Sequence, residues 1–190
     1  ERLFQRRRLL RRPRPFTYPA GRIRIPNDSK SRAGGVLYSD YSLGRFFAEA
    51  ARQPWFENTI FLVTADHCAS SAGRTEIPLQ KYHIPALILA PGLIEPGVVD
   101  GIVSQIDLMP TLLSLLNMSY DSHFYGRSIF DPAYVNRAFI ATYQDLGYLE
   151  GDTFTILSPV RRFEQYRVVP TEENPQDAKR TYETSSIFLS

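Results

Sequence analysis

The chain has 190 residues, of which 43% are hydrophobic and 22% charged, an ordinary globular composition long enough to bury a core. It contains no run of about 18 consecutive apolar residues and no signal-peptide core after Glu1, so we expect neither a membrane span nor a secretory leader. The single cysteine, Cys68, excludes an internal disulfide.

The first 14 residues are strongly basic. They hold seven arginines and one acid, Glu1, whereas the rest of the chain carries 15 basic and 19 acidic residues. Such a run could bind nucleic acid or an anionic surface, or could be a solvated tail. No interleaving of basic and aromatic residues continues beyond it, which favours the solvated tail. We therefore expect no nucleic-acid partner and treat residues 1–14 as foreign to the fold.

An irregular loop and then a helix are predicted next. Residues 13–35 are rich in proline and glycine, which is typical of a loop. A helical pattern of apolar residues begins near Tyr38, with Ser39 or Asp40 as a possible cap, and Pro54 is expected to end it.

Two short apolar runs predict buried central strands. The first covers residues 59–65 and stops at Asp66 and His67, and the second covers residues 84–90. Continuous apolar runs are typical of parallel sheets covered on both faces, and open α/β folds place ligands at the carboxyl edge of such a sheet. We expect Asp66 and His67 at that edge.

The carboxyl-terminal half is predicted to hold a helix and a small antiparallel subdomain. The helix begins at Asp107, with Pro110 in its first turn, where no amide donor is lost. The subdomain covers residues 136–190 and ends in a helix over residues 176–189. Its strand-like pieces are residues 138–143, 146–149, 154–157 and 166–169, with a turn at 150–152.

Seven segments, taken in order, carry a resemblance to a known family. They are residues 15–23, 38–41, 54–59, 64–73, 82–85, 90–92 and 104–111. Together they resemble the sulfatase-like branch of the alkaline phosphatase superfamily, in particular the lipoteichoic acid synthase and membrane phosphoglycerol transferase group. The resemblance implies an α/β fold: a partial alkaline-phosphatase-like sandwich with a central, mostly parallel sheet flanked by helices. Residues 15–135 would be the carboxyl-terminal part of its catalytic domain.

The same resemblance implies one divalent metal ion, manganese or magnesium in preference to calcium or zinc, with Asp66 and His67 as ligands. Taken alone, an Asp-His dipeptide usually marks only the start of a loop, but its place among the seven segments favours the ligand interpretation. Arg74 and His83 are weaker candidates for substrate binding. Arg74 could equally be a surface residue, and His83 could pack against the following strand.

The implied function is a metal-dependent phosphoglycerol transferase that acts on phosphodiesters of membrane lipid or glycan in the cell envelope. In that family a threonine nucleophile and the other metal ligands lie far upstream of the Asp-His pair. We therefore expect the missing amino-terminal half of the catalytic domain as a partner, and no activity from this chain alone. The parent protein would lie in the cell membrane with its catalytic domain outside the cytoplasm. Two alternatives stay open: a sulfatase or phosphatase of the same fold, and a non-catalytic module that binds polyanions.

Overall fold

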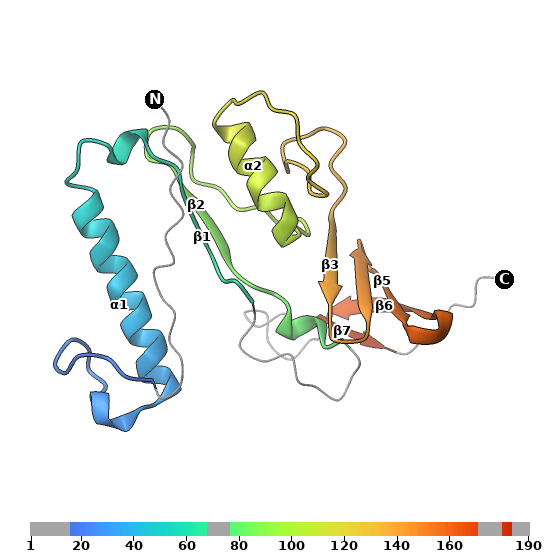
Figure 1. Cartoon of the computed structure of the whole chain (residues 1–190), viewed down its shortest axis with the longest axis horizontal. Coiled ribbons are helices and arrows are strands. Elements are labelled where there is room, and N and C mark those ends of the chain that lie inside the picture. Colours follow the sequence, from blue (N-terminus) through green and yellow to red (C-terminus); the bar gives the residue numbers. More distant parts are fainter. Residues whose placement is uncertain (1–15, 68–76, 171–179, 184–190) are drawn as a thin grey trace. The chain divides into compact units, whose positions relative to one another are not determined.

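The computed structural model describes residues 16–67, 77–170 and 180–183 (Figure 1). The chain divides into two units, one formed by Glu1–Thr59 with Pro91–Leu93 and the other by Ile60–Ala90 with Ile94–Ser190. Within the described residues the first unit carries the longer helix and the second carries every strand, and each unit is described by itself. The division predicted at residues 14 and 135 stays a prediction.

The first unit is built on helix α1, Arg32–Ala50, between the short 3-10 turns Asn27–Ser29 and Phe56–Asn58. Its N-cap is Ser31, whose Oγ accepts a hydrogen bond from the Gly34 amide at 3.0 Å. The predicted start at Tyr38 is therefore wrong, because Ser31 caps the helix earlier. The helix also ends at Ala50, before Pro54.

Two glycines in the first turns of α1 allow the preceding loop to pack against the helix. A Cβ on Gly34 would lie 2.1 Å from the hydroxyl oxygen of Tyr18, and one on Gly35 would lie 2.9 Å from Phe16. The Tyr18 side chain is buried, and its hydroxyl donates to the carbonyl of Pro26 at 2.9 Å. These glycines had indicated a loop, because glycine weakens helices, but here they permit close contact.

The Gly34→Ala substitution is expected to lower the free energy of unfolding by about 1–2 kcal/mol, because overpacking against the Tyr18 ring outweighs the gain in helix propensity. Gly44→Ala, in the same helix, is the matched control, since nothing lies within 4 Å of its added Cβ. It should raise stability by about 0.5–1 kcal/mol. Urea denaturation followed by far-UV circular dichroism measures both, and an equal gain in both variants would disprove the packing argument.

The second unit begins with a two-stranded sheet of β1, Phe61–Thr64, and β2, Ala86–Leu89. The strands lie where apolar runs predicted them, but they pair antiparallel, with Phe61 opposite Leu89. The expected parallel arrangement is not found in the described residues, whose strand pairings are all antiparallel. An apolar run indicates that a strand is buried but does not indicate the direction in which the strand pairs. β1 is also only half-buried, with Thr64 exposed.

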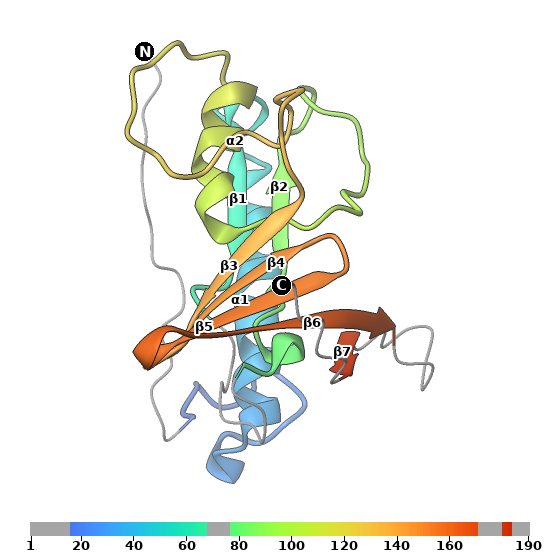
Figure 2. The same cartoon turned by 90° about the vertical axis from the view of Figure 1, so that its right-hand side faces the viewer.

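A five-stranded antiparallel sheet follows, as the strand-like pieces predicted, with its strands in chain order (Figure 2). Gly151, with φ at 58°, lies in the tight turn between the second and third strands. The predicted terminal helix is wrong at Arg180–Glu183, which form the edge strand, because pairing with the neighbouring strand outweighs a weak helical stripe. The strands are β3 Arg137–Ala141, β4 Leu146–Glu150, β5 Thr153–Ser158, β6 Arg162–Pro170 and β7 Arg180–Glu183.

The core of the second unit lies on one face of this sheet. Phe154 and Ile156, which alternate along β5, are buried together with Ile77, the first described residue after the gap that follows His67. Leu79 joins the same cluster from the 3-10 turn Leu79–Lys81. The described residues 77–79, which precede β2, are thus anchored in the sheet core.

Helix α2, Leu108–Leu115, follows a 3-10 turn at Gln105–Asp107. Asp107 is its N-cap position and Pro110 lies in its first turn, which confirms the prediction. In the parts of the chain that the structure describes, no helix has the length and apolar character needed to cross a membrane.

Candidate metal site

Asp66 and His67 lie just after the end of β1, separated from it by Ala65. Both side chains are exposed to solvent. The Asp66 side chain is 91% exposed and the His67 side chain 77%, and Oδ1 of Asp66 lies 3.8 Å from Nε2 of His67. The His67 amide also donates to Asp66 Oδ1 at 3.1 Å, which orients the carboxylate. The structure therefore brings the two predicted ligands together at a strand end and leaves them accessible.

Two hydrogen-bonding side chains fix the loop that carries this pair. Thr64 Oγ1 donates to the carbonyl of Pro85 at 3.1 Å and so joins the end of β1 to the start of β2. Gln105 Nε2 donates to the carbonyls of Ala65 at 3.0 Å and Asp66 at 3.3 Å. Sequence reasoning missed Gln105 as part of the site. Its only signal was its place in the segment 104–111.

The donor atoms fit a divalent cation as part of a larger ligand set. Two ligands of one ion, each bound at about 2.0–2.2 Å, lie about 3–3.5 Å apart, close to the 3.8 Å observed. A carboxylate oxygen and an imidazole nitrogen together suit manganese, zinc or magnesium. Within residues 16–67, 77–170 and 180–183, no three His, Cys, Asp or Glu residues are grouped to hold an ion. The pair thus supplies two ligands and needs others.

Of the other residues considered as ligands or substrate contacts, the structure describes only His83. Arg74, Cys68 and the basic tail at 1–14 lie outside the described residues. His83 lies before β2 with its side chain exposed, so the structure does not support the expectation that it packs against the strand. A substrate contact by His83 stays a prediction.

A buried ionic network lies next to Gln105. Asp107 is fully buried, and its carboxylate accepts two hydrogen bonds from the Arg137 guanidinium, at 2.9 and 3.1 Å. It also accepts from the Tyr134 hydroxyl at 3.0 Å, the Arg127 amide at 2.9 Å and the Ser104 amide at 3.1 Å. Five donors thus satisfy the two carboxylate oxygens, as a buried charge requires.

The network shifts the pKa values of its members. Burial favours the neutral acid at Asp107, but the hydrogen bonds from Arg137, Arg127 and Tyr134 outweigh it, so the pKa of Asp107 is lowered. The pKa of Tyr134 is raised to about 12 by burial and by its hydrogen bond to the Asp107 carboxylate. Asp107 is therefore a charged structural residue, and its burial keeps it from an ion in solution.

The segment 104–111 has a structural role that its sequence alone did not explain. Thr111 is buried, and its Oγ1 donates to the Asp107 carbonyl at 2.7 Å and accepts from the Ile129 amide at 3.1 Å. A Cβ on Gly126 would lie 2.1 Å from the Ile106 carbonyl oxygen, so the two backbones pack closely. These contacts hold the turn that carries Gln105.

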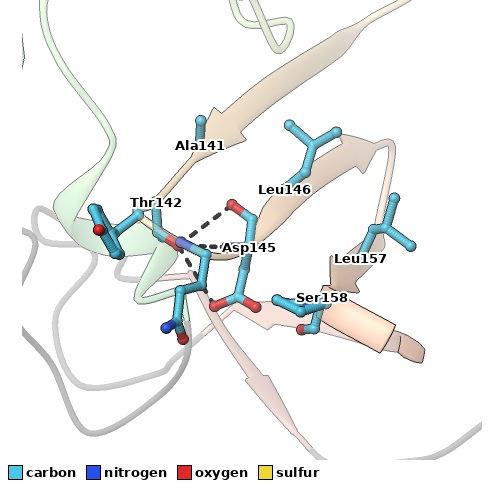
Figure 3. Close-up of a pocket in the computed structure, with 9 residues that line it drawn as sticks. Ala141, Thr142, Asp145, Leu146, Leu157 and Ser158 are labelled. Carbon is cyan, nitrogen blue, oxygen red and sulfur yellow. Dashed lines mark hydrogen bonds between the residues drawn. The ribbon is translucent and has the colours of Figure 1, made fainter. Parts of the chain in front are cut away.

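A shallow recess of about 390 Å³ lies between the β3–β4 turn and the end of β5 (Figure 3). Thr142 and Asp145 bond to each other within the turn: the Asp145 amide donates to Thr142 Oγ1 at 2.9 Å, and the Thr142 amide donates to the Asp145 carbonyl at 2.9 Å. Leu146 and Leu157 line the remainder and are half-exposed. Because Thr142 and Asp145 already bond to each other, the recess is a weaker candidate than the Asp66–His67 loop.

Comparison with protein families finds a match to the sulfatase family over residues 10–118. The match begins inside the basic segment that sequence analysis set apart. An arylsulfatase from Clostridium perfringens (strain 13 / Type A) is 30% identical over 107 residues, which cover 52% of this chain and 22% of that protein.

Among solved structures, a protein of the alkaline phosphatase superfamily from Vibrio parahaemolyticus matches with a TM-score of 0.76 and 34% sequence identity. The match covers 87% of this chain and 44% of the other, so the chain spans less than half of that protein. This likeness confirms the predicted α/β, alkaline-phosphatase-like fold.

Proposed function

This chain belongs to the sulfatase family, and on that premise we propose that Asp66 and His67 are two ligands of a divalent cation used to cleave or transfer an anionic ester. The observation that supports this most is the exposed carboxylate and imidazole, 3.8 Å apart, on a loop held by Gln105. An exposed pair held in this way can bind an ion from solution, whereas the buried Asp107 is already saturated.

Each residue has a distinct part in the proposed site. The Asp66 carboxylate supplies negative charge, and His67 binds through a neutral ring nitrogen. A bound cation supplies charge stabilisation for the oxygens of the transferred group. The nucleophile and the remaining ligands are proposed to come from the amino-terminal part of a sulfatase domain. The matched segment covers only 22% of the arylsulfatase.

The proposed substrate is a phosphodiester of membrane lipid or glycan, and the proposed reaction is phosphoglycerol transfer by a threonine nucleophile. The seven family-like segments support this choice, and manganese or magnesium is the proposed ion. The protein would act on the outer side of the cell membrane. A sulfate ester is the second candidate, because one relative is named an arylsulfatase. The nucleophile decides between the two substrates.

Substrate assays with the full-length natural protein test the proposal. We expect cleavage of phosphatidylglycerol and of nitrophenyl phosphodiesters, no cleavage of nitrophenyl sulfate, loss of activity with EDTA and recovery with Mn²⁺. Cleavage of the sulfate ester alone would favour the second candidate. Full activity after exhaustive chelation would contradict the cation site.

A further inference from the structure

We propose that Gln105 is a positioning residue for the Asp66–His67 pair, an inference that rests on the proposed function of that pair. The Gln105 side-chain amide crosses from the turn before α2 to two consecutive carbonyls, those of Ala65 and Asp66. These carbonyls belong to the two peptide groups on either side of Asp66. Holding both groups fixes the backbone of Asp66 and the start of His67, and so fixes where the two side chains project.

Gln105 is suited to this task because its own backbone is held firmly. Its neighbour Ser104 is buried, and the Ser104 amide donates to the Asp107 carboxylate in the manner of a capping box. Asp107 is in turn held by Arg137 of β3. Only the side-chain torsions of Gln105 remain to be ordered when it binds the loop, which keeps the entropic cost low.

Because the Gln105 side chain is exposed, its role in positioning the loop can be tested without disturbing the packed core. The side chain is exposed, so it adds little to the packed core. Its hydrogen bonds are nevertheless long-range, because Ala65 and Asp66 lie 40 and 39 residues away in the sequence. An exposed side chain that bonds to the backbone of a candidate ligand loop resembles the outer shell that orients metal ligands, whose loss typically reduces metal affinity about 10–100-fold.

The substitution Gln105→Glu tests the inference with little change in shape. An ionised glutamate cannot donate a hydrogen bond and repels both carbonyl oxygens at about pH 7. We expect faster hydrogen exchange of the His67 amide in this variant and Mn²⁺ affinity at His67 about 10–100-fold weaker. Thermal unfolding should stay within about 0.5 kcal/mol of the parent chain, because the side chain is exposed.

Two-dimensional NMR on this chain provides the measurement, with Mn²⁺ alone as the probe, because paramagnetic broadening detects weak binding. Gln165→Glu is the matched control, since the Gln165 amide donates to Thr155 Oγ1 at 3.1 Å in the five-stranded sheet, away from the Asp66–His67 loop in sequence. It should leave the exchange and the broadening of His67 unchanged.

The outcomes separate the two proposals. An unchanged rate of amide hydrogen exchange at His67 in Gln105→Glu would overturn the role of Gln105, regardless of the Mn²⁺ broadening observed. Faster exchange with no Mn²⁺ broadening at His67 in the parent chain would support positioning by Gln105 and contradict the cation assignment. Equal Mn²⁺ broadening at His67 in parent and variant would support the cation assignment and overturn the role of Gln105 in positioning the pair for ion binding. Faster exchange together with weaker Mn²⁺ broadening supports both.

Discussion

Replacement of either proposed ligand is expected to remove catalysis. In the full-length natural protein, Asp66→Ala and His67→Ala should each lower kcat/KM by more than about 100-fold, because loss of an outer-shell partner alone typically costs about 10–100-fold. Both side chains are exposed, so the free energy of unfolding should change by less than about 0.5 kcal/mol. Steady-state kinetics with a phosphodiester substrate and thermal unfolding measure the two effects.

Matched surface residues provide the controls for this experiment. Asp152→Asn removes an exposed acid that is paired with Arg167 at 3.1 Å, and His123→Ala removes an exposed histidine. Both should leave the rate unchanged. An undiminished rate in either Asp66→Ala or His67→Ala would remove that residue from the site.

Breaking the buried ion pair is expected to have the largest effect on stability. Arg137→Met removes two hydrogen bonds from a fully buried carboxylate, and should lower the free energy of unfolding by about 3–5 kcal/mol. Arg167→Met is the matched control, because its partner Asp152 is exposed and such surface pairs contribute little to stability. Urea denaturation at neutral pH compares the two variants, and equal losses would contradict the role assigned to Asp107.

The Asp107–Arg137 pair also predicts how the stability lost in Arg137→Met depends on pH. The pKa of Asp107 in the folded protein is lowered below its ordinary value of 3.8, so the folded state binds this proton less readily than the unfolded state. The stabilising contribution is therefore complete above the ordinary value and is lost as pH falls through the lowered pKa. The difference in the free energy of unfolding between the parent chain and Arg137→Met should be largest near neutral pH and should become smaller in strong acid. A gap that is constant with pH would contradict this account.

Sequence reasoning located the elements whose signals are local. The apolar runs placed β1 and β2, the turn at 150–152 placed the hairpin of β4 and β5, and Pro110 marked the first turn of α2. Each signal depends on residues that are neighbours in the chain. The same kind of signal placed Asp66 and His67 at a strand end.

The missed features depend on partners far apart in the sequence. Gly34 and Gly35 predicted a loop, because the Tyr18 and Phe16 side chains that need their small size lie at least 16 residues away. The strand at Arg180–Glu183 exists through pairing with β6, which its own weak pattern does not encode. Strand direction was missed for a similar reason, since a side-chain pattern is the same in parallel and antiparallel pairs.

The sequence by itself determined which residues carry the candidate chemistry, since an acid and a histidine at the end of an apolar run are recognisable without coordinates. Only the tertiary structure decided how they are held. The Gln105 amide reaches carbonyls about 40 residues back, and the Asp107 carboxylate meets Arg137 30 residues ahead. Side-chain hydrogen bonds of this kind form between whichever groups the fold brings together, and the distance along the chain gives no sign of them.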